Sequence, residues 1–218
     1  MIIPNLLLIA GTCTKSGKTS LACRIIEQFK SLNITAIKIS PHFHETTPGL
    51  KTILEETGYG IYEETDMNAT KDTARMLRSG ASKVYFAKVV DKRLKFVFDK
   101  IMDLIPECTP IICESPALRN FIEPGLFIII TSETTNKHKN ISHLQSLPHV
   151  MFKLEELKRM KSIPVLFEKG KWHDASMYGS VATDPYIDFP YFSSSISAIS
   201  FPSLAFILSR SCFIPATA

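Results

Sequence analysis

The feature that most constrains this chain is a nine-residue segment near the N-terminus, Gly11-Thr12-Cys13-Thr14-Lys15-Ser16-Gly17-Lys18-Thr19. It follows an apolar run at residues 5–10, which has the length and continuity of a strand buried on both faces. The next segment, residues 18–30, carries apolar residues at helical spacing. A glycine-containing loop between a strand and a helix is a setting in which backbone amides and the helix dipole bind phosphate.

The residue types of this loop have separate chemical tasks. Gly17 lets the backbone approach a ligand, Lys18 reaches the β- and γ-phosphates, and the Thr19 hydroxyl is a ligand for Mg²⁺. Lys18 is also a predicted catalytic residue, because its charge stabilises the transferred phosphoryl group. We therefore predict a Walker A loop that binds ATP or GTP with Mg²⁺. The predicted nucleotide-binding residues are Thr12, Cys13, Thr14, Lys15, Ser16, Gly17, Lys18, Thr19 and Ser20.

The loop departs at one place from the general pattern G-x-x-x-x-G-K-[ST], because Thr12 stands at the first glycine position and Gly11 lies one residue earlier. The form Gly-Thr-x-Thr-x-x-Gly-Lys-Thr resembles the loop of dethiobiotin synthetase, in which aspartate stands at the place of Cys13. Related loops, with Ser for the second Thr, occur in cobyrinic acid amide synthases. Lys15 is interpreted as a solvated lysine that adds positive potential near the phosphates.

A second apolar run, residues 34–39, predicts a strand, and ligands of parallel sheets bind at the carboxyl ends of strands. The stretch that begins at Lys38 resembles a Lys-His-x-His-His-like stretch of molybdopterin-guanine dinucleotide biosynthesis protein B. Dethiobiotin synthetase has a substrate-holding lysine there. These resemblances make Lys38 a candidate catalytic residue that contacts a second substrate or the phosphates; the alternative is an ordinary strand-edge lysine. His42 and His44 are two positions apart, so their side chains point the same way on an extended segment. They are either a pair of metal ligands or ordinary loop residues.

Residues 70–81 predict a short helix that Thr70 caps and Gly80 ends. The segment resembles the Gly-Lys-Asp-Ser-x-Arg-x-x-x-Ala-Gly-Ala stretch of the same molybdopterin-guanine dinucleotide protein. Dethiobiotin synthetase also has an aspartate near this point that contacts Mg²⁺. By this resemblance Asp72 is a candidate metal ligand, and the alternative is a helix acid favoured by the dipole. Arg75 either binds the phosphates or pairs with a carboxylate.

The run from Pro110 to Ser115 predicts a buried strand that ends in a carboxylate. In nucleotide-binding sheets an acid at this strand end faces Mg²⁺ and its waters, so Glu114 is a predicted catalytic residue and the Walker-B-like partner of Thr19. Both families named above have a glutamate after such a strand. In dethiobiotin synthetase it begins a Glu-Gly-x-Gly-Gly turn, and Ser115-Pro116-Ala117 replaces those glycines here.

The remaining segments continue an alternation of strands and helices. The expected strands are residues 84–89, 126–131, 149–152 and 163–167, and the expected helices are residues 93–105 and 154–161. Residues 45–69 read as an acidic loop that covers the site, with a short helix at 52–57. Asn136-Lys137 is similar to the start of a guanine-recognition motif, but the aspartate that would follow is missing here. The expected fold is therefore α/β of the P-loop NTPase class, a three-layer sandwich whose mostly parallel sheet has helices on both faces.

Composition sets the domain boundary and the compartment. We assign residues 1–171 to one nucleotide-binding domain and residues 172–218, which carry little charge, to a poorly ordered tail. The five cysteines include no C-x-x-C pair, which favours a reduced, cytoplasmic protein. The net charge of +4 is spread along the chain, and prolines and serines interrupt the apolar tail, so neither a nucleic acid nor a membrane is expected as a partner.

Two classes of function fit a site for Mg²⁺ and a nucleoside triphosphate. The first resemblance implies an accessory protein of molybdenum-cofactor biosynthesis that hydrolyses its nucleotide slowly and works as a homodimer with a protein partner. The second implies an ATP-dependent ligase, in which a carbamate or carboxylate attacks the γ-phosphate. A nucleotide-binding protein of neither pathway is the third possibility. Ser115-Pro116 in place of glycines, and the match at residues 71–81, favour the accessory protein.

Overall fold

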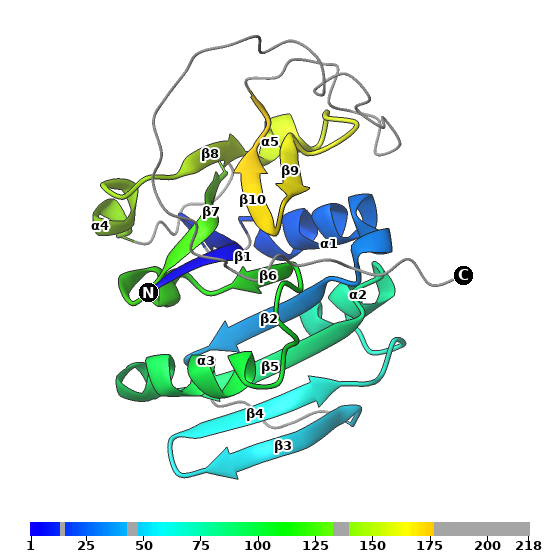
Figure 1. Cartoon of the computed structure of the whole chain (residues 1–218), viewed down its shortest axis with the longest axis vertical. Helices are drawn as coiled ribbons and strands as arrows, with labels where there is room; N and C mark the ends of the chain where they lie inside the picture. The colour runs from blue at the N-terminus through cyan, green and yellow to red at the C-terminus, as the bar shows by residue number, and fades with distance from the viewer. Residues whose placement is uncertain (14–15, 43–47, 133–139, 177–218) are drawn as a thin grey trace, which may run out of the picture.

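The computed structural model describes residues 1–13, 16–42, 48–132 and 140–176, and its centre is an eight-stranded sheet (Figure 1). The strand order is β3-β4-β5-β2-β6-β1-β7-β8. Its strands are β1 (Ile2–Gly11), β2 (Thr35–Ser40), β3 (Leu50–Glu56), β4 (Tyr59–Glu64), β5 (Lys83–Val89), β6 (Ile111–Glu114), β7 (Glu123–Thr131) and β8 (Val150–Lys153). The strands from β5 to β8 in this order pair in parallel, whereas β3 and β4 are antiparallel. The prediction of an α/β fold with a mostly parallel sheet is confirmed.

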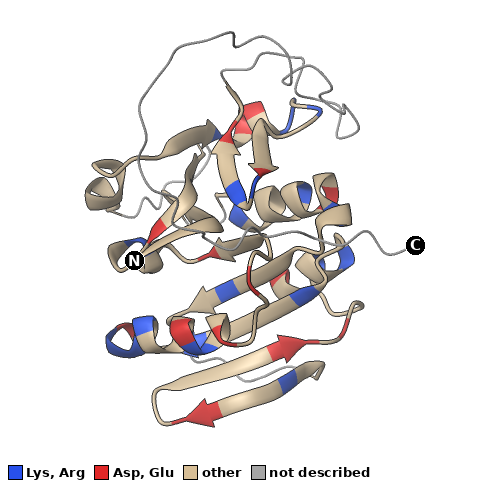
Figure 2. Ribbon diagram, viewed as in Figure 1, with Lys and Arg blue, Asp and Glu red and all other residues tan. Residues whose placement is uncertain are grey.

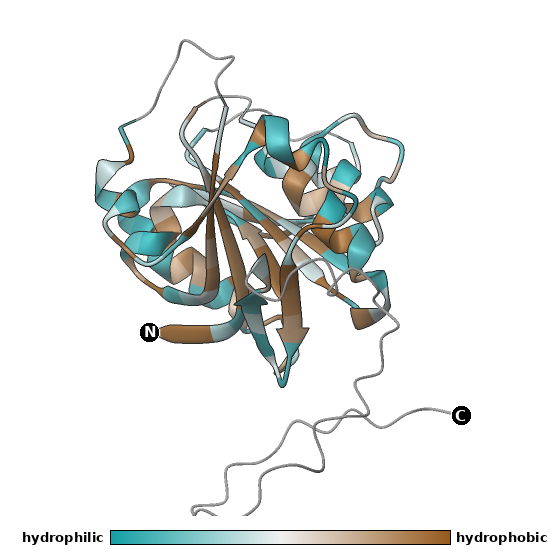
Figure 3. Cartoon of the chain, turned by 90° about the horizontal axis from the view of Figure 1, so that it is seen from above, coloured by the Kyte–Doolittle hydropathy of each residue, from teal (hydrophilic) through white to brown (hydrophobic). Residues whose placement is uncertain are grey.

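Helices lie on both sides of the fan of strands (Figure 3). Alternation along β1 divides the core, because Leu7 and Ile9 pack with α1 whereas Leu6 and Leu8 pack with α3. Such an arrangement is compatible with a three-layer α/β fold. The α-helices are α1 (Lys18–Gln28), α2 (Asp72–Arg78), α3 (Leu94–Met102), α4 (Ser142–Gln145) and α5 (Leu154–Leu157), and the 3₁₀ helices are η1 (Lys30–Leu32), η2 (Asp91–Arg93) and η3 (Pro116–Asn120). Among the described helices, none has the length and apolar character needed to cross a bilayer.

The helix predicted at residues 52–57 is wrong, because this segment forms β3 of an antiparallel hairpin with β4. Tyr59 and Ile61 alternate into the core on the α3 face, and β4 extends the sheet beside β5. Four of the acidic residues that suggested a loop, Glu55, Glu56, Glu63 and Glu64, lie on these two strands near the edge of the sheet (Figure 2). Charged side chains are common on edge strands, where they discourage further strand pairing. The hairpin therefore completes the sheet.

The start of α2 also differs from the prediction. Lys71 occupies the N-cap position and makes no capping bond through its side chain, so the expected Thr70 cap is wrong. Instead the buried hydroxyl of Thr73 donates a hydrogen bond to Glu64 Oε2 (2.6 Å), and Glu64 Oε1 accepts the Asp66 amide (3.0 Å). The end of β4 thus fixes the first turn of α2.

The chain leaves the main sheet after α5. The strand expected at 163–167 is β9 (Val165–Glu168), which forms a separate two-stranded antiparallel sheet with β10 (Lys171–Asp174). Trp172 on β10 is fully buried, and its ring lies 5.4 Å from that of Phe29 and 5.0 Å from that of Phe167. Packed residues continue to Ala175, beyond the boundary that we drew at residue 171. Residues 177–218 of the predicted tail lie outside the described part of the chain.

Replacement of Trp172 tests whether β10 belongs to the core. Trp172→Ala should lower the free energy of unfolding by about 3–5 kcal/mol, because it removes a large buried aromatic side chain. Urea denaturation followed by circular dichroism measures the change. Phe121→Ala is the control, since Phe121 is 44% exposed. Equal stability of the two variants would contradict the assignment.

Candidate active site

Strand register brings two of the predicted residues together. Lys38 on β2 and Glu114 on β6 are direct partners in the parallel pairing of these strands. Both follow residues, Ala36 and Ile112, that face the core beneath α1, and side chains two positions apart lie on the same face of a strand. Lys38 and Glu114 therefore both project toward the side of the sheet that carries α1 and α2.

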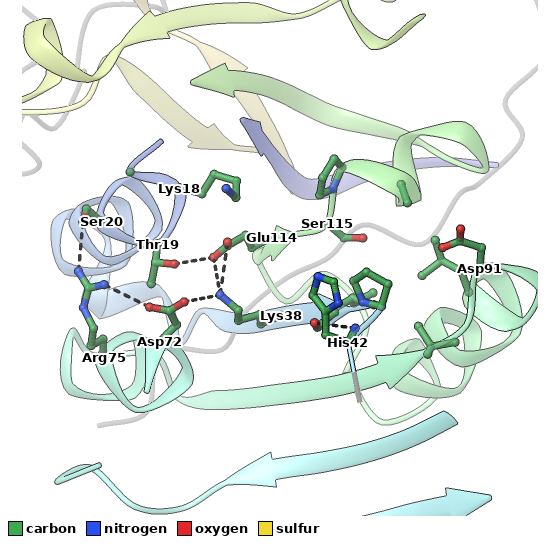
Figure 4. A pocket seen from close by; sticks show the side chains of 18 residues that line it. Lys18, Thr19, Ser20, Lys38, His42, Asp72, Arg75, Asp91, Glu114 and Ser115 are labelled. Carbon is green, nitrogen blue, oxygen red and sulfur yellow. Dashed lines mark hydrogen bonds and ion pairs between the residues drawn. The ribbon is translucent and has the colours of Figure 1, made fainter. Parts of the chain in front are cut away.

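The first turns of α1 and α2 complete a polar cluster around Lys38 (Figure 4). The Thr19 hydroxyl donates a hydrogen bond of 2.8 Å to Glu114 Oε2. The Lys38 ammonium lies 2.5 Å from Asp72 Oδ2 and 3.4 Å from both oxygens of Glu114. The Glu114 side chain is only 8% exposed, so its charge is compensated by these contacts rather than by bulk water. Residues from four separate segments thus converge on one point.

Arg75 forms an outer layer of this cluster. Its Nη1 lies 3.3 Å from Asp72 Oδ1, and its Nη2 donates to the Ser20 hydroxyl at 3.1 Å. Arg75 therefore pairs with a carboxylate, which was one of its two predicted roles. Burial by itself raises the pKa of Asp72, but the hydrogen bond and charge of Lys38, the hydrogen bond of Thr19 and the charge of Arg75 outweigh burial and lower it. Asp72 is consequently a stable carboxylate at neutral pH.

Two glycines shape the loop ahead of α1. Gly17 has a φ of +89°, and a Cβ there would meet Leu154 Cδ1 at 2.5 Å. A Cβ on Gly11 would lie 2.1 Å from Ser16 Oγ, so the chain folds back directly over Gly11. The first hydrogen bond of the helix runs from the Leu21 amide to the Gly17 carbonyl (2.9 Å). The leading amides of a helix have no intrahelical acceptors, which makes this end of α1 suited to an anion.

A cavity of about 620 Å³ opens beside this loop at the carboxyl ends of β2, β5 and β6. It extends from Lys18 past the cluster to the starts of η3 and α3 (Figure 4). It includes several residues that the sequence did not suggest. Its lining consists of Gly17, Lys18, Thr19, Ser20, Lys38, Ile39, Ser40, Pro41, His42, Asp72, Arg75, Val89, Asp91, Leu94, Glu114, Ser115, Pro116 and Ala117.

Other predicted residues are placed differently. Cys13 is fully buried, and the Thr12 amide donates to the Ile130 carbonyl at 3.1 Å, so both residues anchor the loop to the sheet and lie outside the cavity lining. Ser16 is buried and its hydroxyl accepts from Lys18 Nζ at 3.3 Å. His42 lines the cavity, and within the described residues no group of three His, Cys, Asp or Glu side chains is arranged to hold a metal ion. Thr14, Lys15, His44, Glu45, Asn136 and Lys137 lie outside the described residues.

Comparisons of this protein with protein-family models, with curated proteins and with solved structures found no match. A functional assignment therefore depends on the geometry of this cavity and on the chemistry of the residues that line it.

The close approach at Gly11 is testable without a ligand. Gly11→Ala should destabilise the fold by about 1–3 kcal/mol, because the added methyl group overlaps Ser16 and forces the loop away from the sheet. Thermal unfolding measures the effect. Gly170→Ala is the comparison for backbone strain alone, since Gly170 has a positive φ (+75°), which Gly11 lacks, and no atom within 4 Å of an added Cβ. Unchanged stability of Gly11→Ala would show that the loop has room to relax.

Proposed function

We propose that this chain is a P-loop protein that binds Mg²⁺ and a nucleoside triphosphate, GTP or ATP, and hydrolyses it slowly. The observation that carries the proposal is the meeting of Thr19, Lys38, Asp72 and Glu114 in one cavity beside the Gly17-Lys18 turn. A hydroxyl and two carboxylates beside a helix N-terminus are the groups that a metal–triphosphate complex requires.

The donor set fits Mg²⁺. The Thr19 hydroxyl and the Glu114 carboxylate are already in hydrogen-bond contact, and hard oxygen donors of this kind are the ligands that Mg²⁺ prefers. Asp72 supplies a further carboxylate on the other side of Lys38. When bound, Mg²⁺ would neutralise phosphate charge, while the loop amides and Lys18 hold the β- and γ-phosphates.

Slow hydrolysis follows from the contacts of Glu114. This carboxylate accepts a hydrogen bond from Thr19 at Oε2 and lies 3.4 Å from the Lys38 ammonium at both oxygens, so both of its oxygens are engaged. These contacts have to rearrange before the carboxylate can accept a proton from an attacking water. The residues are consequently better suited to bind and orient a triphosphate than to activate water strongly.

The turn after β6 favours the accessory-protein reading over the ligase. Ser115 occupies the N-cap position of η3 with φ −161°, and Pro116 begins that 3₁₀ helix. A glycine-rich turn would bring backbone close to a second substrate, whereas side chains and a proline ring stand here. We therefore favour a role like that of the molybdenum-cofactor accessory protein, cytoplasmic and dimeric with a protein partner, over a ligase of the dethiobiotin synthetase type.

Removal of the loop lysine tests the nucleotide site. Lys18→Ala should weaken binding of Mg·GTP and Mg·ATP about 30- to 150-fold, because one charge-assisted contact to the phosphates contributes roughly 2–3 kcal/mol. Isothermal titration calorimetry with both nucleotides measures it and shows which base is preferred. Lys95→Ala, which breaks only an exposed helix ion pair, is the control. Unchanged affinity in Lys18→Ala would remove the phosphate site from the proposal.

Lys38 tests the metal site without nucleotide. Its ammonium lies between Asp72 and Glu114, so Lys38→Met should leave Glu114 without its cation and Asp72 with Arg75 alone. We expect Mn²⁺ alone to bind Lys38→Met about tenfold or more tightly than the wild type, a gain of ~1.4 kcal/mol. Electron paramagnetic resonance of free Mn²⁺ measures it, with Lys95→Met as the control. Equal Mn²⁺ affinity in all three proteins would show that the carboxylates do not form a cation site.

A further inference from the structure

We propose that the part of the cavity beyond Lys38 and Glu114 binds a second small molecule, a primary alcohol with an apolar body and a cationic amine, which accepts the γ-phosphoryl group. This inference rests on the proposed nucleotide site and adds a second substrate to it, which side chains rather than the backbone of a glycine-rich turn would contact. We call this part of the cavity the acceptor subsite and define it by Val89, Asp91, Leu94, Ser115, Pro116 and Ala117.

The position of the acceptor subsite follows from the fold. Thr19, Lys38 and Asp72 belong to the side of the sheet that carries α1 and α2, whereas Val89 and Leu94 belong to the core cluster on the α3 side. The cavity therefore passes over the strand ends from one face of the sheet to the other. The proposed triphosphate site lies on the first side, beside the start of α1, and the acceptor subsite lies on the second.

Ser115 supplies a free polar contact at the junction. The residue is only 3% exposed, it lines the cavity, and within the described residues its hydroxyl has no hydrogen-bond partner. It directly follows Glu114, so a ligand hydroxyl that bonds to Ser115 would lie beside the carboxylate that is proposed to hold Mg²⁺ (Figure 4). A hydroxyl both donates and accepts, which suits an alcohol as the ligand group.

The apolar walls of the acceptor subsite and Asp91 at its far end indicate the other two features of the ligand, an apolar body and a cationic amine. The lining here includes the apolar side chains of Val89, Leu94 and Pro116. An aliphatic part of a ligand would contact them favourably, whereas a water molecule would gain nothing from them. Asp91, at the end of the cavity remote from Ser20 (Figure 4), is exposed and forms no ion pair with any described residue. The nearby cation Arg93 instead lies over the Tyr59 ring at 5.4 Å. Asp91 is thus available to a ligand ammonium.

The transfer balances without a further reactant. The alcohol oxygen forms a bond to the γ-phosphorus, and the bond from that phosphorus to the β–γ bridging oxygen breaks. The nucleoside diphosphate leaves with the electron pair of that bond, and the hydroxyl proton passes to solvent. Lys18 and Lys38 lie where negative charge gathers on the transferred group, so positioning and electrostatics carry the step.

The test uses the full chain loaded with Mg²⁺ and the GTP or ATP analogue that calorimetry shows to bind, with the β–γ oxygen replaced by an NH group. Three probes of equal length are added: 5-amino-1-pentanol, 1-pentanol and 5-hydroxypentanoate. We expect 5-amino-1-pentanol to bind best and to shift the amide resonances of residues 89–94, Ser115 and Ala117. Asp91→Asn should weaken it about tenfold and leave 1-pentanol unchanged, and Ser115→Ala should weaken both alcohols. Asp103→Asn, on an exposed residue at the far end of α3, is the control.

With the natural nucleotide, phosphorus NMR should show a phosphomonoester of 5-amino-1-pentanol. If the analogue binds but no probe shifts these resonances, the acceptor subsite is refuted and the nucleotide site stands. The same holds if 5-hydroxypentanoate binds best, or if Asp91→Asn behaves like Asp103→Asn. Binding without a phosphomonoester refutes the acceptor role. If no nucleotide binds, the proposed function and this inference fail together.

Discussion

The contact on which the candidate site depends is the Lys38 ammonium between Asp72 and Glu114. Two carboxylates on neighbouring elements repel one another, and a partly buried pair needs a cation to remain ionised. Lys38 supplies it from the strand next to Glu114, and Arg75 supports Asp72 from the outer side. This cluster therefore joins β2, β6 and the first turns of α1 and α2, and it gathers two carboxylates and two cations in one place.

The same cluster links the site to pH. Because the pKa of Asp72 in the folded protein is lowered, its contribution to stability is present above the pKa of the unfolded chain and is lost as pH falls through the folded value. Acid therefore removes one of the two charges that hold Lys38. The side chains of Asp72 and Lys38 are 41% and 20% exposed, so solvent screens much of this interaction and limits its share of the total stability. The cluster serves the geometry of the site more than the stability of the fold.

Much of the sheet and the meeting of Thr19, Lys38, Asp72 and Glu114 could be predicted from the sequence. Each strand core is an uninterrupted apolar run, and parallel strands bring their carboxyl ends to one edge, so residues far apart in sequence share that edge. The β3–β4 hairpin was missed because its acidic residues outweighed the alternation of Tyr59 and Ile61. The burial of Trp172 was missed because a change in composition was taken as a domain boundary. Asp91 and Ser115 follow β5 and β6 closely, and that position was their only signal in the sequence.

The cavity crosses the strand ends from one face of the sheet to the other. Thr19 and Asp72 lie in the first turns of helices on one face of the sheet, whereas Ser115 caps η3 and Leu94 begins α3 on the other. The cavity therefore lies where successive connections leave opposite faces, which is the place where open α/β sheets bind ligands. Because apolar residues of the α3 side line the same cavity, the cavity is continuous from the Thr19–Glu114 contact on one face of the sheet to α3 on the other, and the two proposed ligands would need this continuity.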